Sequence, residues 1–332
     1  MNFRTTLIIF ILFALSAGGY FLFWGGEREE SSGTNEQPKI SEVYGLNPGT
    51  VQKIHLSFKD TSFHPLSLKK NDNGEWQLID PVTAYANESK VAEMLDDLLN
   101  KRIKRTMEVT NLSQFTLDVP NIQIDLWTDG GTIGKSFLIG GKTVNYSVYA
   151  KEASESHIFL IESSALQDLT KSPADFRTRN ALKFEPDDVT EITLSIAGEE
   201  PIRCQTGGGA EWRMAAPIGV KADSKEIRSI LDALHVLKVV EFTKDGAADL
   251  REYGLDHPRI RLSLQLRDES QALLVGSDIP GTAHIYVKPD TLESVYAVNR
   301  EIINTLDRSV FDLRDKRVID FQRTGTKRFE IQ

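Results

Sequence analysis

The chain has 332 residues, which is enough for two domains of ordinary size. Hydrophobic residues make up 40% and charged residues 26%, a balance that excludes a disordered or fibrous protein. The net charge of −9 argues against nucleic-acid binding, because phosphate backbones are bound by clustered Lys and Arg, and the single cysteine excludes disulfides within the chain and multi-cysteine metal sites.

Residues 7–24 form an uncharged apolar run near the lower length limit for a transmembrane helix. Arg4 precedes the run and several glutamates follow it, which places residues 1–6 in the cytoplasm and the rest of the chain outside. A cleaved signal peptide is the alternative, with Ala14-Leu15-Ser16 as a loose cleavage site, but the apolar run continues through Trp24. The sequence therefore predicts a single-pass membrane protein with its C-terminal domains outside the cytoplasm.

Most of the remaining chain is an internal duplication. A polar segment at residues 25–47, which we predict to be a flexible tether, joins it to the anchor. We expect one unit at residues 48–184 and a second at residues 185–321. Residues 322–332 resemble the opening strand of a third unit, and we expect them to pair with an edge of the second unit. Residues of the two units match at distances of 136 to 138 positions, for example Trp76 with Trp212, Pro81 with Pro217, Leu95 with Leu231, Gly140 with Gly276 and Phe184 with Phe321.

Each unit is predicted to be α+β: a mainly antiparallel sheet with one amphipathic helix and a short closing helix. Alternation of Ile192, Leu194 and Ile196 with polar residues is typical of a half-buried strand. Asn87 and Asp223 are suitable N-caps for the two amphipathic helices. Strands dominate and long crossover helices are missing, which favours antiparallel pairing over a doubly wound sheet. We expect the same topology in both units.

The segment Ile139-Gly140-Gly141-Lys142-Thr143 resembles the end of a phosphate-binding loop. The glycine that the motif requires five residues earlier is Ser136, and a strand pattern follows where the motif needs a helix. We therefore predict a hairpin turn here. Cys204 matches Leu68 of the first unit and is expected to be a small buried hydrophobe. Trp76 and Trp212 are expected to face the core.

Six histidines are scattered without metal-ligand spacing (His55, His64, His157, His235, His257 and His284). Ser156, His157 and Asp168 are the three residue types of a hydrolase triad and lie near one another in the sequence. However, no nucleophile-elbow pattern surrounds a serine. Asp118 and Asp256, in the pattern Leu-Asp-x-Pro, are expected to begin turns. No catalytic, cofactor-binding or metal-binding residue is predicted, and we expect no cofactor.

The anchor, the tether, the segment 186–192, Trp212 ahead of Pro217, and the run Tyr253-Gly254-Leu255-Asp256-His257-Pro258 together resemble one bacterial family, the domain of unknown function numbered four-three-four-zero. The resemblance covers about residues 48–321 and is stronger in the second unit. It implies no activity or catalytic residue. For a bacterial protein the expected anchor lies in the inner membrane and the C-terminal domains lie in the periplasm. The resemblance also implies a genomic neighbourhood, because members resemble accessory proteins encoded beside gliding-type ABC transporter components.

Two functions follow as hypotheses. The first is a non-catalytic interaction module that is held at the membrane by its N-terminal helix and docks on an ABC-type transporter complex. The alternative is an extracytoplasmic enzyme that acts on cell-envelope glycan through a carboxylate pair, which would have to lie about 5 to 9 Å apart in a cleft with one raised pKa. No spacing in the sequence singles out such a pair, so the interaction module is favoured.

Overall fold

The structure, a computed structural model, describes residues 37–128, 133–207, 211–246, 249–267 and 269–317. The expected anchor, the first part of the tether and the expected C-terminal strand lie outside these ranges. Within the ranges, no helix is both long and apolar enough to cross a membrane.

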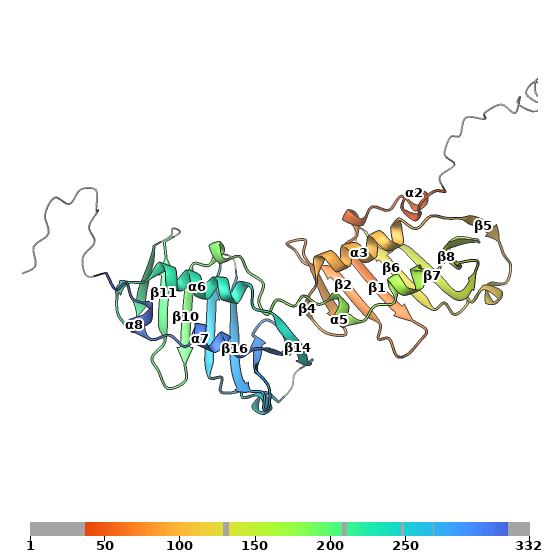
Figure 1. Cartoon of the computed structure of the whole chain (residues 1–332). Helices are drawn as coiled ribbons and strands as arrows, with labels where there is room; N and C mark the ends of the chain where they lie inside the picture. The colour runs from red at the N-terminus through yellow and green to blue at the C-terminus, as the bar shows by residue number, and fades with distance from the viewer. Residues whose placement is uncertain (1–36, 129–132, 208–210, 247–248, 268, 318–332) are drawn as a thin grey trace, which may run out of the picture.

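The described residues form two nine-stranded antiparallel sheets that lie end to end (Figure 1). The strands of the first sheet are β1 (Lys53–Phe58), β2 (Leu66–Lys70), β3 (Trp76–Asp80), β4 (Ala84–Tyr85), β5 (Arg105–Glu108), β6 (Ile122–Trp127), β7 (Ile133–Val144), β8 (Ser147–Glu152) and β9 (His157–Glu162). Those of the second are β10 (Glu191–Ile196), β11 (Ile202–Thr206), β12 (Trp212–Ala216), β13 (Val220–Lys221), β14 (Val239–Lys244), β15 (Ile260–Gln265), β16 (Ser270–Asp278), β17 (His284–Pro289) and β18 (Val295–Asn299).

The two sheets have the same strand order, β4-β3-β2-β1-β6-β7-β8-β9-β5 in the first and β13-β12-β11-β10-β15-β16-β17-β18-β14 in the second. Trp76 begins β3 and Trp212 begins β12, so each Trp-bearing strand is second from its sheet edge. Even the irregularities repeat, because the register shifts at Ser67 in β2 and at Arg203 in β11. The predicted α+β fold with tandem antiparallel units is confirmed for the described residues.

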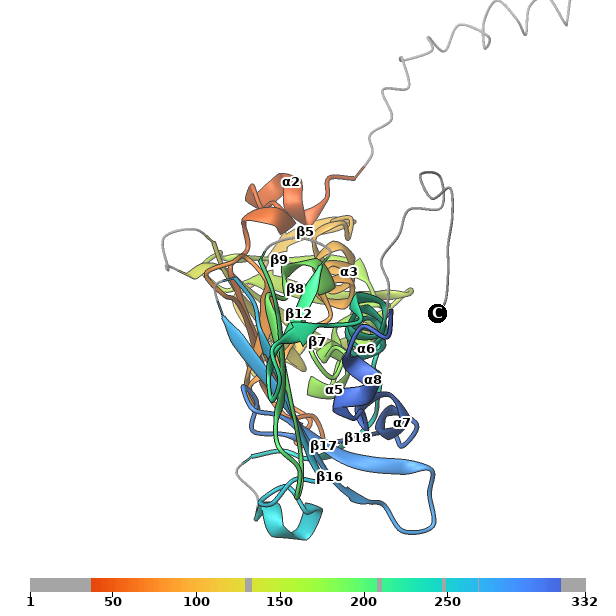
Figure 2. The ribbon, with the colours of Figure 1, turned by 90° about the vertical axis from the view of Figure 1, so that its left-hand side faces the viewer.

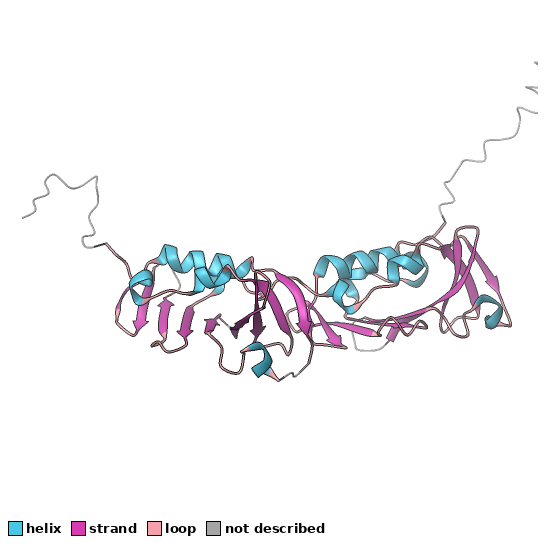
Figure 3. Ribbon diagram, turned by 60° about the horizontal axis from the view of Figure 1, so that its bottom comes forward, coloured by secondary structure: helices cyan, strands magenta, loops and turns pink. Residues whose placement is uncertain are grey.

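Helices cover one face of each sheet (Figures 2 and 3). Asn87 caps α3 and Asp223 caps α6, each through side-chain oxygens that accept backbone N–H groups of the first turn, as predicted. The helices are α2 (Ile40–Tyr44), α3 (Glu88–Leu99), α4 (Ala165–Leu169), α5 (Pro173–Phe176), α6 (Ser224–His235), α7 (Ile302–Leu306) and α8 (Val310–Leu313), with 3-10 turns η1 (Pro48–Thr50), η2 (Leu112–Phe115), η3 (Pro186–Asp188) and η4 (Leu250–Tyr253).

A core lies between the helices and the sheet in each unit. The buried residues of α6 recur at helical spacing and contact the alternating apolar residues of the strands. Trp76 is 5% exposed and Trp212 is 7% exposed, so both belong to these cores, as predicted. On the opposite face, η4 places Tyr253 and Leu255 against Leu274.

A close backbone approach explains the paired glycines in the two units. A Cβ atom on Gly140 would lie 2.4 Å from the carbonyl oxygen of Phe115, and one on Gly276 would lie 2.2 Å from that of Tyr253. Only glycine allows the turn that precedes Leu117 or Leu255 to pack this closely on the strand. The glycine shared by the two units, Gly140 in the first and Gly276 in the second, is therefore needed for packing.

Two boundaries differ from the sequence-based expectation. Part of the expected tether is ordered, because α2 forms and buries Ile40 to 1% exposure. At the end of the first unit, Phe176 belongs to the first core, whereas Leu182 and Phe184 pack in the second. A repeat period shows that a unit recurs but not at which residue it begins, so the sequence placed this boundary a few residues too late.

We predict that Leu231→Ala lowers the free energy of unfolding by about 2–5 kcal/mol, because it empties a buried position of α6. Val236, which follows the same helix and is 61% exposed, is the matched control, and Val236→Ala should change stability by less than about 0.5 kcal/mol. Chemical denaturation of both variants tests this. Equal effects would contradict the assignment of this helix face to the core.

Candidate functional site at the junction of the two units

The segment that resembled a phosphate-binding loop lies within a strand, so the hairpin turn predicted at residues 139–143 occurs a few residues later. Gly140 to Thr143 lie within β7, and Asn145 and Tyr146 turn the chain into β8 with positive φ angles of 46° and 55°. The backbone N–H of Gly141 donates to Thr116 Oγ1 at 2.6 Å. No helix N-terminus follows, so the segment lacks the anion-binding geometry of a phosphate loop.

The structure does not bring the hydrolase-like residues together. His157 lies 3.7 Å from Glu155, whereas Asp168 pairs with Lys101 at 2.6 Å. Other histidines have local partners: His55 with Ser67, and His235 with the Phe184 carbonyl oxygen. In the part of the chain that the structure describes, no group of His, Cys, Asp and Glu could hold a metal ion.

Cys204 is 1% exposed and lies opposite Met214 in the sheet, which confirms its predicted position in the core. Burial raises the pKa of its thiol to about 11. A thiol with so high a pKa is protonated at neutral pH and is a poor nucleophile.

A cluster of polar side chains that the sequence pattern did not reveal lies where the two units meet. The connecting segment 177–180 lies along the edges of both sheets: Thr178 N–H donates to the Tyr85 carbonyl at 3.0 Å, and Val239 N–H donates to the Arg179 carbonyl at 2.7 Å. Isolated bridges join Ala86 with Arg177 and Asn180 with Lys238. The backbone thus ties β4 of the first unit to β14 of the second.

Arg177 is the central side chain of this junction. Its side chain is 3% exposed. The guanidinium Nη1 donates to both carboxylate oxygens of Asp245 at 2.9 Å, and Nη2 donates to the Ser294 hydroxyl at 3.1 Å. The guanidinium also stacks over the ring of Phe242, 4.0 Å from its centroid, and lies 5.7 Å from that of Tyr296. A residue of the first unit therefore places its charge inside the second.

Two further contacts complete the junction. Tyr85 of β4 packs against the second core, and burial raises its pKa against the lowering effect of a hydrogen bond with Thr291. Lys183 forms an ion pair with Glu75 at 2.8 Å; burial alone would raise the pKa of Glu75, but this pair and the Asn71 amide lower it. The junction combines apolar packing with charges from both units.

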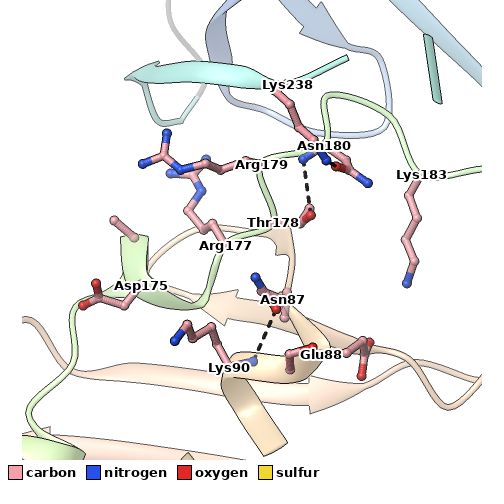
Figure 4. A pocket seen from close by; sticks show the side chains of 13 residues that line it. Asn87, Glu88, Lys90, Asp175, Arg177, Thr178, Arg179, Asn180, Lys183 and Lys238 are labelled. Atoms are coloured by element: carbon pink, nitrogen blue, oxygen red, sulfur yellow. Dashed lines mark hydrogen bonds between the residues drawn. The ribbon is translucent and has the colours of Figure 1, made fainter. Parts of the chain in front are cut away.

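A pocket of about 660 Å³ opens at the junction (Figure 4). Its two carboxylates are engaged elsewhere: Glu88 accepts the Trp76 N–H at 2.8 Å and Asp175 accepts the Ser172 hydroxyl at 2.7 Å. The lining is mostly basic and polar, formed by Ala86, Asn87, Glu88, Ser89, Lys90, Ala174, Asp175, Arg177, Thr178, Arg179, Asn180, Lys183 and Lys238.

The arrangement offers electrostatic binding more than acid–base chemistry. Arg179 donates to the carbonyl oxygens of Val239 and Val240, and Lys238 donates to the Asn180 amide, so both cations contact neutral oxygens. Among the described carboxyl groups, the pKa of Asp97 is raised, first by burial and then by nearby Asp168. That carboxyl does not line the junction pocket.

The sequence held one clue to the junction. Asp175-Phe176-Arg177 recurs as Asp312-Leu313-Arg314, which marks this arginine as part of the repeated unit. The clue does not show which arginine is buried, because the partners of Arg177 lie between 65 and 119 residues further along the chain.

We predict that Arg177→Ala lowers the free energy of unfolding by about 2 kcal/mol, because charged hydrogen bonds and stacking are lost and Asp245 is left unpaired. Arg314→Ala removes the exposed equivalent and should change stability by less than about 0.5 kcal/mol. Denaturation and hydrogen exchange of the full-length chain in detergent test this. The exchange of residues 237–240 should increase only in the Arg177 variant; equal behaviour of the two variants would refute the assignment.

We also predict that Cys204 in the folded chain resists a thiol-specific reagent at pH 8, since its thiol is buried and protonated. The same chain unfolded in guanidinium should react at once. Because the chain has one cysteine, the absorbance of the released reagent product reports this site alone. Rapid modification under native conditions would contradict its place in the core.

Comparison with known proteins places the chain among its relatives. A family model described as "Domain of unknown function (DUF4340)" matches twice, over residues 76–211 and 212–332. The two matches adjoin at Trp212, so the family unit runs from one Trp-bearing strand to the next. No curated protein and no solved structure matches the chain. The chain therefore belongs to the DUF4340 family, as a tandem pair of its domain.

Proposed function

We propose that the chain is a non-catalytic interaction module, anchored in the inner membrane, that serves an ABC-type transporter complex of the gliding kind. The observation that carries the proposal is the junction: the ion pair of the buried Arg177 with Asp245 and a shared backbone edge hold two repeated units as one elongated body. Arrays of repeated units present long continuous surfaces, which suit docking on large partners.

The anchor and its orientation are part of the proposal. The apolar residues 7–24 would cross the inner membrane with residues 1–6 in the cytoplasm and both units in the periplasm. The polar segment that follows, up to Gln37, gives a reach of some tens of Å, which holds the units near the bilayer and raises their local concentration there. A module that meets a membrane-embedded partner gains from this restriction.

The transporter itself is proposed from the family resemblance. Members of this family resemble accessory proteins encoded beside gliding-type ABC transporter components, an associational argument that does not rest on fold. The competing function, a glycan-cleaving enzyme, would need a carboxylate with a raised pKa beside a second carboxylate in a cleft. Asp97 has the raised pKa, but its neighbour Asp168 is held by Lys101 at 2.6 Å.

The proposal predicts that the protein loses its cellular function when it is released from the membrane. Replacing residues 1–24 with a cleavable signal peptide would deliver the remaining chain to the periplasm, and we expect the phenotype of the deletion strain at matched protein abundance. The control is the same chain with a transmembrane helix of unrelated apolar sequence, which should restore function.

Full function of the released chain would refute docking at the membrane and favour the enzyme. In that case Asp97→Asn should abolish activity, whereas under the present proposal this variant keeps its function.

A further inference from the structure

The two ends of the elongated body differ, and at the first end a helix fills the place of a neighbouring unit. Tyr44 of α2 packs with its ring centroid 5.2 Å from that of Phe137 and 6.1 Å from that of Phe159. Phe159 is opposite β5, as Tyr296 is opposite β14 in the second unit. In the second unit, Tyr85 of the first unit lies near Tyr296, as Tyr44 lies near Phe159. Helix α2 thus caps the first unit, as terminal elements of repeat arrays do.

The outer end of the second unit has the same backbone arrangement that the first unit contributes to the junction. Arg314 bridges to Ala222 just as Arg177 bridges to Ala86. The next residue continues the match, since Asp315 N–H donates to the carbonyl of the residue before Ala222 at 2.9 Å, and the corresponding bond at the junction is 3.0 Å. The backbone at this end is therefore arranged as it is at the junction, with β13 and α8 in the places of β4 and α5.

The side chains at this end are uncovered among the described residues. Phe311, which stands where the first unit has Ala174, is 56% exposed. The guanidinium of Arg314 lies 4.7 Å from its ring centroid, and the ammonium of Lys316 lies 5.3 Å from it. Together with Val220 these residues border a hollow of about 570 Å³. Within the described chain Arg314 forms no ion pair, whereas its equivalent Arg177 is paired with a carboxylate.

We propose that this surface, defined by Val220, Phe311, Arg314 and Lys316, is a docking site for a different protein, which presents a carboxylate beside an aromatic ring at the end of a β-sheet. The chemistry follows from the junction, where the equivalent arginine receives Asp245 and the ring of Phe242 from the β14 edge. A positive end with an exposed ring fits such a partner by charge and by stacking. The inference rests on the proposed function and names the surface and the partner's chemistry.

A second copy of this chain fits the surface poorly. Its β14 edge is already covered by its own first unit. Its other sheet end has Thr106 opposite Phe159, where the junction has Phe242 opposite Tyr296, and Tyr44 fills the adjoining place. Among the described residues, neither the β14 edge nor the β5 edge of a second copy offers a carboxylate beside a free aromatic ring in the junction geometry.

The test uses the full-length anchored chain in the membranes of its source cells. Phe311 is replaced by photo-reactive p-benzoylphenylalanine, the membranes are irradiated, and the adduct is identified by mass spectrometry. We expect one adduct with a different protein, cross-linked near an acidic residue. Arg314→Glu in the same chain should lower the adduct yield about tenfold or more, because a like charge then faces the partner's carboxylate.

Arg228→Glu is the matched control, since Arg228 is an exposed arginine of α6 that pairs with Asp187 and Asp232 and does not border the hollow. It should leave the adduct unchanged. The decisive arm is a charge exchange: Lys in place of the partner's cross-linked carboxylate should restore the adduct to the Arg314→Glu chain. An adduct with a second copy, an adduct within the chain, no adduct, or equal yields from the two arginine variants would each overturn the proposal.

These outcomes separate the docking surface from the proposed function. If the released soluble chain is inactive but Phe311 gives no adduct, the membrane module stands and this surface is excluded. If the released chain is active, the proposed function fails whatever the cross-linking shows.

Discussion

The arrangement of the two units depends on the burial of one guanidinium. Arg177 carries its charge from the end of the first unit to a place where its side chain is 3% exposed, and such a charge is costly unless it is paired and hydrogen-bonded. Asp245, Ser294 and the ring of Phe242 supply those contacts. Because the partners come from β14, from the residue after it and from the residue before β18, these contacts fix the second unit in place against Arg177. The continuous edge formed by the connecting segment then joins the sheets.

Duplication explains why equivalent residues have different surroundings. The two ends of a repeated unit are complementary to each other, so each end must be covered by a neighbouring unit, a capping element or a partner. At the junction the two ends cover each other. At the outer end of the first unit, Tyr44 of α2 packs where a preceding unit would supply Tyr85. At the outer end of the second unit, Arg314 and Phe311 stand exposed in the described chain, with the backbone already set for a neighbour.

Local patterns in the sequence predicted the interior of each unit well. Helix caps at Asn87 and Asp223 and the buried positions of Trp76, Trp212 and Cys204 depend on neighbours within the strand, helix or turn, and periodicity reports such positions directly. The junction could not be predicted in the same way. Its contacts join residues far apart in sequence, and the repeat makes Arg177 and Arg314 look alike. Helix α2 was also missed, because five residues are too few for periodicity to separate a capping helix from a polar tether.

The central claim is that this two-unit body works as a docking module for a membrane complex. Affinity purification of the full-length chain from detergent-solubilised membranes, with quantitative mass spectrometry of the eluate, tests it most directly. An identically tagged chain that lacks residues 1–24 and is exported to the periplasm is the reference. The account predicts that subunits of an ABC-type transporter accompany the anchored chain in a fixed ratio and are depleted with the reference. Recovery of the anchored chain alone, from membranes in which the transporter is present, would contradict it.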